Sequence, residues 1–395
     1  MDTLVELFDE RAIENVLGAE MFKPKNVIYL CPPELVDVDK FLNTIKSFFR
    51  KRELKIDVKI VKSSLFETGE ILAQLEDIYE KYPNMGIDVT GGNDAALFAT
   101  GMFCQKTKLP AFTYSRKNNR FYNIMNADFA DDVECTLNYS VEDFFLMAGG
   151  TLRKGRVDNN LLSRYEKDFD KFFDIFLQHK REWPDQITFF QRISRNHHDE
   201  EINLSVSGML DQKGEHGRRV YGSKNLLTKL RDIGFLTSLE FFDEQVRFTF
   251  KDEQIRAWLR DVGSALELYM YEACRKTGIF GDVISSAIVD WDGYVGRDSV
   301  SNEIDVVATR GVTPIFISCK ACDVKTEALN ELAIIRDRFG GKGAKAVIAT
   351  TESINAAARH RAAQLGIAVI DIEEMIASEV PKRLKVIMKC YEQGA

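Results

Sequence analysis

Two charged residues, Asp305 and Lys320, stand in neighbouring apolar runs near the C-terminal end of the chain. Residues 302–308 (NEIDVVA) and 314–320 (PIFISCK) have the composition of β-strands that are buried on at least one face. A buried charge is costly unless it is paired or binds a metal. A carboxylate can hold a divalent cation while a lysine on the next strand orients water, which suits phosphodiester hydrolysis. On spacing alone, a structural ion pair at a sheet edge is an equal alternative.

A helix-and-strand frame is predicted around this pair. A helix over 263–274 carries Glu267, and it precedes a strand and the two charged strands. A helix over 326–339 and a strand over 346–350 follow, which gives an α-β-β-β-α-β order for residues 262–395. Glu267 could reach the same metal from the helix side. The alternative is a surface glutamate on an amphipathic helix.

The first 139 residues alternate strands with helices, as in a parallel α/β domain. The predicted strands are 26–31, 55–62, 86–90 and 111–114. This pattern predicts a Rossmann-like doubly wound sheet, with ligands bound beyond the carboxyl ends of its strands. Thr90-Gly91-Gly92-Asn93-Asp94 lies at such an end, where glycines and a helix N-terminus suit a phosphate. The run matches neither G-x-G-x-x-G nor a P-loop, and a tight strand-to-helix turn is the alternative.

Residues 140–261 form a different region. Aromatic residues at helical spacing over 140–182 predict a core or a dimer face. A helix over 224–236 and two short strand-like runs, 239–242 and 246–250, resemble a winged-helix unit. Because the helix is poor in base-reading residues, a structural or substrate-positioning role is at least as well supported as sequence-specific recognition of DNA.

Composition indicates a globular chain of two or three domains. The chain has 395 residues, 45% of them hydrophobic, and a net charge of −8, which excludes a uniformly basic nucleic-acid coat but not a basic groove. There is no run of eighteen apolar residues and no basic signal-like N-terminus, so a cytoplasmic protein without a membrane contact is expected. The seven cysteines are expected to be reduced thiols, and zinc binding by Cys319 and Cys322 is disfavoured.

Four short motifs together carry a family resemblance. Residues 302–305 (NEID), 316–320 (FISCK) and 338–341 (RFGG) resemble PD-(D/E)xK restriction-endonuclease-like nucleases. Residues 88–92 (DVTGG) resemble a CARF domain, the Rossmann-like sensor of cyclic oligoadenylates. Together they are similar to the ancillary nucleases of type III CRISPR systems, and the resemblance spans nearly the whole chain.

The resemblance implies roles in a nuclease site. Asp305 would bind Mn²⁺ or Mg²⁺, Lys320 would be the motif lysine and Glu267 the helix acid. Ser318 stands where the family motif has an acid. Glu303 could complete the metal shell, as could an acid on the next helix, where Glu331 is the best placed and Glu327 the next. The backbone carbonyl of Cys319 could also take a metal position.

The resemblance also implies a sensor site for cyclic tetra-adenylate. The residues expected to bind it are Cys31, Pro32, Thr90, Gly91, Gly92, Asn93 and Asp94, with Ser63, Ser115 and Arg116 at other strand ends. Because this ligand has twofold symmetry, a C2 homodimer is expected. The implied activity is ligand-activated, metal-dependent endonucleolytic cleavage of DNA, RNA or both. One alternative is a cyclic-oligoadenylate-responsive DNA-binding regulator with a degenerate nuclease domain, and another is a ring nuclease that degrades the signal.

Overall fold

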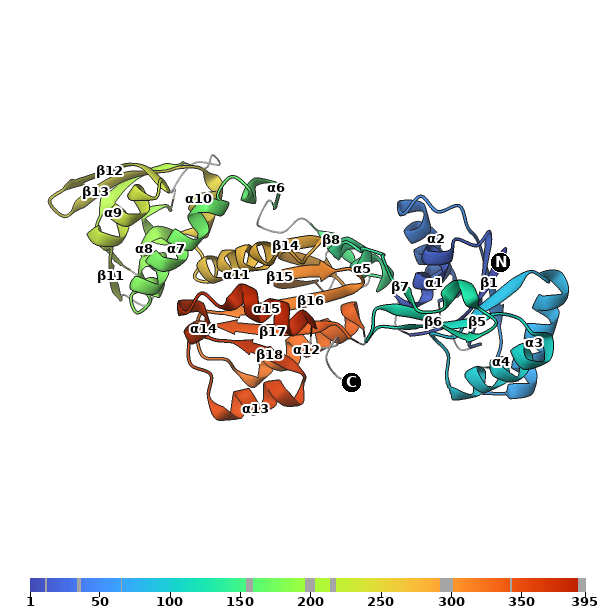
Figure 1. Ribbon diagram of the computed structural model, residues 1–395. Coiled ribbons are helices and arrows are strands. Elements are labelled where there is room, and N and C mark those ends of the chain that lie inside the picture. Colours follow the sequence, from blue (N-terminus) through green and yellow to red (C-terminus); the bar gives the residue numbers. More distant parts are fainter. Residues whose placement is uncertain are drawn as a thin grey trace.

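The computed structural model describes residues 1–10, 13–33, 37–64, 66–153, 159–195, 203–213, 218–291, 301–341 and 343–389. Three parts lie along an elongated molecule, and their order in space differs from their order in the chain (Figure 1). The C-terminal sheet lies in the centre, between the N-terminal sheet on one side and the middle region on the other. The C-terminal sheet is therefore in a position to contact both of the other parts.

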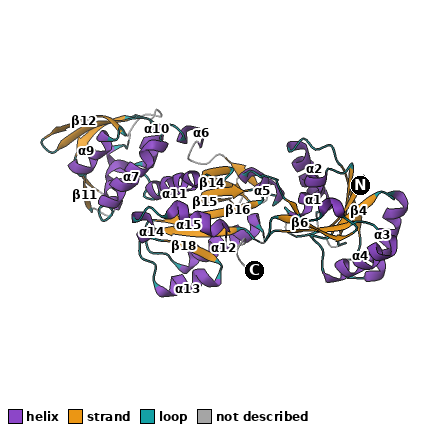
Figure 2. Ribbon diagram, in the orientation of Figure 1, coloured by secondary structure: helices purple, strands orange, loops and turns teal. Residues whose placement is uncertain are grey.

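The N-terminal part is a seven-stranded sheet of order β3-β2-β1-β4-β5-β6-β7. The first five strands are parallel, and β6 and β7 run antiparallel. Separate apolar cores on its two faces contain α1 with α2, and α3 with α4, which makes it a doubly wound sheet (Figure 2). Its elements are β1 Thr3–Leu7, α1 Glu14–Phe22, β2 Asn26–Cys31, α2 Val38–Lys51, β3 Asp57–Lys62, α3 Thr68–Lys81, β4 Met85–Asp88, α4 Asp94–Thr107, β5 Ala111–Ser115, β6 Arg120–Met125, a 3-10 turn Asp128–Ala130 and β7 Val133–Glu134.

The sequence pattern did not predict strand β1 of the N-terminal sheet. The sequence pattern placed the first strand at residues 26–31, whereas the sheet begins with Thr3–Leu7 at its centre. All five residues of β1 are buried, so the strand lacks the alternation that marks a half-exposed strand. It also contains the buried acid Glu6, which makes it look like part of a polar N-terminus.

The middle region contains the predicted winged-helix-like unit. Its three-stranded antiparallel sheet has the order β12-β13-β9, with β10 and β11 forming a separate hairpin. The aromatic stripe of α7 is core, since Phe169, Phe172 and Phe176 are buried. The elements are α6 Asn159–Leu162, α7 Glu166–Gln178, α8 Trp183–Ile193, β9 Ser205–Met209, β10 Asp211–Lys213, β11 Arg219–Tyr221, α9 Lys224–Asp232, β12 Leu236–Phe242, β13 Gln245–Phe250 and α10 Glu253–Trp258.

The C-terminal sheet has the order β18-β17-β16-β15-β14-β8. Helix α11 and α15 pack on one face, and α12, α13 and α5 pack on the other. The predicted α-β-β-β-α-β order is confirmed, and α5 with β8, from just beyond residue 139, also join this sheet. The elements are α5 Val141–Met147, β8 Thr151–Arg153, α11 Ser264–Thr277, β14 Asp282–Asp290, β15 Ser301–Arg310, β16 Thr313–Lys320, α12 Thr326–Gly340, β17 Lys345–Thr350, α13 Ala356–Gln364, β18 Ile367–Ile370, α14 Ile372–Ile376 and α15 Val380–Lys389.

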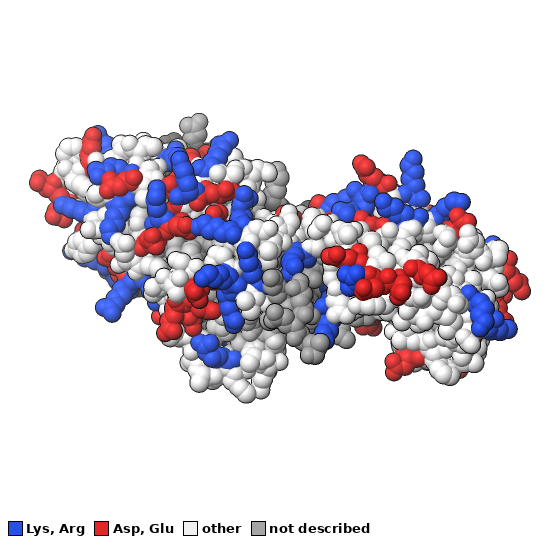
Figure 3. Space-filling model, in the orientation of Figure 1, with Lys and Arg blue, Asp and Glu red and all other residues white. Residues whose placement is uncertain are grey.

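Two general expectations can be compared with the described residues. Within them no helix is long and apolar enough to cross a membrane. Six cysteines there are free thiols, as expected, and Cys390 lies outside the described residues. Lys and Arg are interspersed with Asp and Glu on the face seen in Figure 3, which agrees with the absence of a uniformly basic coat.

Candidate active site and ligand site

Strand β15 is irregular at Asp305. Between the pairs Ser285–Val306 and Ala287–Ile304 lie Asp305 and, opposite it, Ser286, whose φ of 54° is left-handed. Ile304 packs in the core on the α12 side and Val306 in the core on the α11 side, although residues two apart in a regular strand share a face. The two strands keep their register across this irregularity, so it changes the face that the side chains of β15 take without adding a residue to either strand.

The end of the ladder between β15 and β16 holds the Asp305 carboxylate in place. Pairing of these strands begins at Val306–Ile317, so the Cys319 amide is available and donates to Asp305 Oδ2 at 2.5 Å. Ser318 Oγ lies 3.3 Å from the same oxygen and donates to it. Ser318 therefore supports Asp305 through its hydroxyl group.

Helix α11 brings Glu267 to the same place. Gly263, which precedes the helix, has no side chain, and a Cβ there would lie 2.6 Å from Glu267 Oε1. The Gly263 amide donates to Asp261 Oδ1 at 2.7 Å, which turns the chain into the helix. The glycine therefore leaves room for the glutamate to lie against the start of its own helix.

Carboxylates crowd one cavity of about 450 Å³. Glu267, Glu303, Asp305 and Asp261 line it together with Ser286, and Ser286 Oγ donates to Glu303. Burial first, and then the charge of Asp305, raise the pKa of Glu267 to about 8. Burial also raises the pKa of Asp305. The Lys320 ammonium, at the end of β16, lowers the pKa of both groups and is therefore close to them.

These residues fit a divalent cation by donor chemistry. Carboxylate oxygens are the ligands that Mg²⁺ and Mn²⁺ prefer, and a cation would relieve the repulsion that raises the pKa of Glu267. Among the described residues, no group of three or more His, Cys, Asp or Glu side chains is arranged closely enough to hold a metal ion. The carboxylates would have to converge further to share one.

Of the three acids predicted to complete the metal site in place of residue 318, only Glu303 lies near Asp305. Glu303 lines the cavity with Glu267 and Asp305. Glu331 lies on α12, on the opposite face of the sheet, where its Oε1 accepts from Asn302 Nδ2 at 2.9 Å. Glu327, in the first turn of the same helix, is exposed. The structure brings neither helix acid to the cavity.

The sensor site candidates surround the central strands β1 and β4. The strand order changes direction between these two strands, which is where doubly wound sheets bind ligands. A Cβ on Gly91 would lie 2.3 Å from the Leu7 carbonyl oxygen, and the Gly92 amide donates to the Phe8 carbonyl at 3.2 Å. The loop after β1, beginning Phe8-Asp9-Glu10, therefore meets the Gly91-Gly92 turn. The sequence pattern did not predict β1, and for that reason it did not predict the loop that follows this strand.

Other predicted ligand residues have partners inside the domain. Thr90 Oγ1 bonds to the Asp88 carboxylate and accepts from the Tyr114 amide at 2.8 Å, and Asn93 Oδ1 caps α4 by accepting from Ala96 N at 3.0 Å. Burial raises the pKa of the Cys31 thiol to about 12. The remaining predicted residues vary in exposure: Ser63 is buried, Pro32 and Ser115 are half-buried, and Asp94 is exposed.

Arg116 connects the N-terminal and C-terminal sheets. Its guanidinium pairs with Glu14 of α1 at 2.7 Å, and both side chains are largely buried. It also donates to the Val312 carbonyl, in the turn between β15 and β16, at 3.3 Å. The structure therefore engages this predicted ligand residue in a contact between domains.

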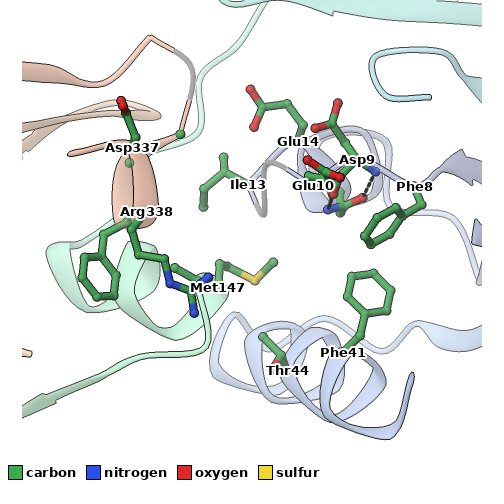
Figure 4. Close-up of a pocket in the computed structure, with 15 residues that line it drawn as sticks. Phe8, Asp9, Glu10, Ile13, Glu14, Phe41, Thr44, Met147, Asp337 and Arg338 are labelled. Carbon is green, nitrogen blue, oxygen red and sulfur yellow. Dashed lines mark hydrogen bonds between the residues drawn. The ribbon is translucent and has the colours of Figure 1, made fainter. Parts of the chain in front are cut away.

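A cavity of about 560 Å³ lies between the N-terminal domain and the C-terminal sheet (Figure 4). Phe8, Asp9 and Glu10 line one side of it, and Met147 and the end of α12, residues 337–341, line the other. The rings of Phe8 and Phe41 pack edge to face, with their centroids 5.4 Å apart. The loop that meets the Gly91-Gly92 turn therefore also faces the helix that packs on the C-terminal sheet.

The fold defined by these parts is a Rossmann-like sheet joined to a restriction-endonuclease-like core, with a winged-helix-like unit between them in sequence. Protein VC1899 from Vibrio cholerae matches it with a TM-score of 0.78 at 16% sequence identity, over 98% of this chain and 98% of its own. Can2 from Sulfobacillus thermosulfidooxidans, solved in complex with cyclic tetra-adenylate, matches with a TM-score of 0.69 at 18% identity, over 98% of this chain and 97% of its own. No protein-family model and no curated protein matches the chain. The predicted fold class is confirmed, with a Rossmann-like N-terminal sheet and a mixed C-terminal sheet.

Proposed function

We propose that this protein is a metal-dependent nuclease of type III CRISPR defence, activated by cyclic tetra-adenylate and cleaving DNA, RNA or both. The observation that carries the proposal is the cavity that gathers Glu267, Glu303 and Asp305, together with Lys320, which follows the Cys319 amide that donates to Asp305. The match in fold to a protein solved with cyclic tetra-adenylate supports the choice of activator.

The chemistry follows from the residues of the cavity. Glu267, Glu303 and Asp305 would hold the divalent cation, with the Cys319 carbonyl as a further candidate ligand. A bound cation would activate water and neutralise charge in the transition state. Lys320 would orient the attacking water and offset the charge that develops on the phosphate oxygens. Hydrogen bonds from Cys319 N and Ser318 Oγ fix the Asp305 carboxylate for this role.

The sensor would act as a C2 dimer. Leu97, Phe98 and Met102 form an apolar strip on α4 and are 38%, 66% and 47% exposed. Large exposed apolar residues at helical spacing are typical of a protein interface, and α4 begins at the Gly91-Gly92 turn. Pairing through α4 would bring two ligand sites together around one symmetric ligand.

Ligand binding would reach the nuclease through the loop after β1. This loop meets the Gly91-Gly92 turn on one side and lines the cavity against the end of α12 on the other. Arg116 adds a second connection through Glu14 and Val312. The ligand must favour one arrangement of these contacts over another, because only a difference in affinity shifts an equilibrium.

A ligand-responsive DNA-binding regulator is the second candidate. The strand order β12-β13-β9 of the middle region supports it, as does Ser318 in place of a motif acid. Purified protein should be incubated with plasmid, labelled single-stranded RNA and DNA, and each cyclic oligoadenylate, with Mg²⁺ or Mn²⁺ and then with EDTA. We expect cleavage that needs both a ligand and a metal. Retardation of DNA without any cleavage would support the regulator instead.

A further inference from the structure

The cavity with the carboxylates has a second wall, made by the middle region. Gln191 and Arg195, at the end of α8, line it together with Gln254, Trp258 and Arg260, in and just after α10. Arginines therefore face Glu267, Glu303 and Asp305 across the same space. No ion pair within the described residues joins Arg195, Arg256 or Arg260 to those three carboxylates.

Hydrogen bonds hold this wall together. Arg256 Nη2 donates to the Ser194 carbonyl at 3.1 Å, and Gln191 Nε2 donates to the Arg260 carbonyl at 2.7 Å. These contacts join the end of α8 to α10, although about sixty residues separate them in the chain. The arginines consequently belong to a wall that hydrogen bonds between two helices hold together.

The guanidinium groups of this wall form no ion pair among the described residues, although carboxylates line the other side of the cavity. None of Arg195, Arg256 and Arg260 forms an ion pair with another residue in the part of the chain that the structure describes. The Nε atoms of Arg256 and Arg260 are buried and have no hydrogen-bond partner there. Burial lowers the pKa of Arg260, and the charges of Arg256 and Arg195 lower it further, so the three groups are close enough to repel one another.

An anion would relieve this repulsion. Guanidinium groups bind phosphate oxygens through paired N–H donors, and buried donors gain most from such a partner. The opposite wall holds the groups that would cut a phosphodiester bond. We propose that Arg195 and Arg260, which line this cavity, bind the backbone phosphates of the nucleic-acid strand and position it for cleavage, and that the neighbouring Arg256 adds positive charge. The inference rests on the proposed function and gives the winged-helix-like region a substrate-holding role.

The test is the binding of nucleic acid under conditions that prevent cleavage. Full-length wild-type protein and an Arg195→Ala, Arg260→Ala double variant should be titrated into fluorescein-labelled single-stranded DNA, single-stranded RNA and duplex DNA of one sequence. EDTA and saturating cyclic tetra-adenylate should be present throughout, and fluorescence anisotropy should be recorded at several salt concentrations. The probe that binds most tightly identifies the strand type.

We expect the double variant to bind the preferred strand at least about tenfold more weakly. The loss of two phosphate contacts should reduce the slope of log affinity against log salt by roughly 1.4 for a single strand or 1.8 for a duplex. A merely structural role would not change this slope. An Arg195→Lys, Arg260→Lys variant keeps the charges and should recover most of the slope. Unchanged affinity for cyclic tetra-adenylate would verify that the variants are folded.

Arg247 provides a comparison within the same region. It is exposed on β13 and does not line the cavity. We expect Arg247→Ala to bind nucleic acid like the wild type. If Arg247→Ala weakens binding while the double variant does not, the strand lies on the wing and the inference is wrong.

The outcome is separable from that of the proposed function. If the wild type binds but never cuts nucleic acid, the nuclease proposal fails while the arginine wall is still supported by the binding data. If the wild type cuts and the double variant retains both its affinity and its KM, the arginine wall is overturned while the nuclease stands.

Discussion

The Cys319 amide donates to Asp305 Oδ2 at 2.5 Å at the point where β15 and β16 stop pairing. The Asp305 carboxylate therefore accepts the hydrogen bond that the Cys319 amide would have donated to β15 if the two strands had continued to pair. Ser318 Oγ adds a second, longer hydrogen bond to the same oxygen. The candidate carboxylate is thus fixed by the neighbouring strand, and Ser318 contributes to that hold.

An acid at position 318 should strengthen metal binding. Ser318→Asp would place a second carboxylate beside Asp305, which favours a cation and increases repulsion when no cation is present. We expect the Mn²⁺ concentration for half-maximal cleavage to fall by about tenfold, and the melting temperature in EDTA to fall as well. Ser318→Asn is the uncharged control of similar shape. Equal metal dependence of the two variants would show that residue 318 does not face the metal.

Glu303 and Glu331 form a matched pair on opposite faces of the sheet. Glu303→Gln should lower metal-dependent cleavage by about 10- to 100-fold, because Glu303 lines the cavity of Asp305. Glu331→Gln should leave the rate close to that of the wild type, because Glu331 bonds to Asn302 on the α12 side. Initial rates on one labelled strand distinguish the two. The reverse order of effects would place the metal on the other face.

Gly91→Ala should impair ligand binding at the proposed sensor site. The added Cβ would lie 2.3 Å from the Leu7 carbonyl oxygen, so the turn must move. We expect cyclic tetra-adenylate to bind at least tenfold more weakly, a change of about 1.4 kcal/mol, when measured by isothermal titration calorimetry. Gly69→Ala on α3 is the control, because a Cβ there meets nothing within 4 Å. Normal ligand binding by Gly91→Ala would remove this turn from the site.

The buried pair Glu6 and Asp88 should make stability depend on pH. They are neighbours on β1 and β4, and burial raises the pKa of Asp88 to about 7 and that of Glu6 well above its usual value. Between about pH 4 and pH 7, folded Asp88 holds a proton that the unfolded chain has released. Stability should therefore fall as pH rises through this window, by about 2 to 4 kcal/mol for Asp88, and the raised pKa of Glu6 adds a loss in the same direction.

Asp88→Asn tests this assignment by urea unfolding at pH 5 and pH 8. The variant cannot ionise at position 88, so its loss of stability between the two pH values should be clearly smaller than that of the wild type. Asp94→Asn, at an exposed position nearby, is the control and should follow the wild type. An undiminished loss in Asp88→Asn would assign the pH dependence to other groups.

The frame of the candidate nuclease site could be predicted from local patterns. The order of elements around Asp305 and Lys320 follows from alternation, helical spacing and turn residues, all of which are visible within short windows. The acid that accompanies Asp305 could not be chosen in this way. That choice depends on which face of β15 each side chain takes, and the irregularity opposite Ser286 changes the face partway along the strand.

Other features depend on contacts between distant segments. Strand β1 is buried on both faces and contains Glu6, so neither alternation nor apolar composition marks it. Arg195 and Arg260 meet only because α8 packs against the end of α10. Arg116 stands at a strand end, as a ligand residue would, but Glu14 and Val312 engage its guanidinium. Such pairings become visible only after the chain has folded.

The most direct measurement of the central claim compares wild type with Asp305→Asn at saturating cyclic tetra-adenylate and Mn²⁺. The initial rate of cleavage of the preferred labelled strand should be recorded, with ligand affinity measured in parallel. We predict that the wild type cuts only when both ligand and metal are present. Asp305→Asn should be slower by about 100-fold or more, which corresponds to roughly 2.7 kcal/mol of lost transition-state stabilisation, with ligand affinity unchanged. Cleavage by Asp305→Asn at the wild-type rate would contradict the account.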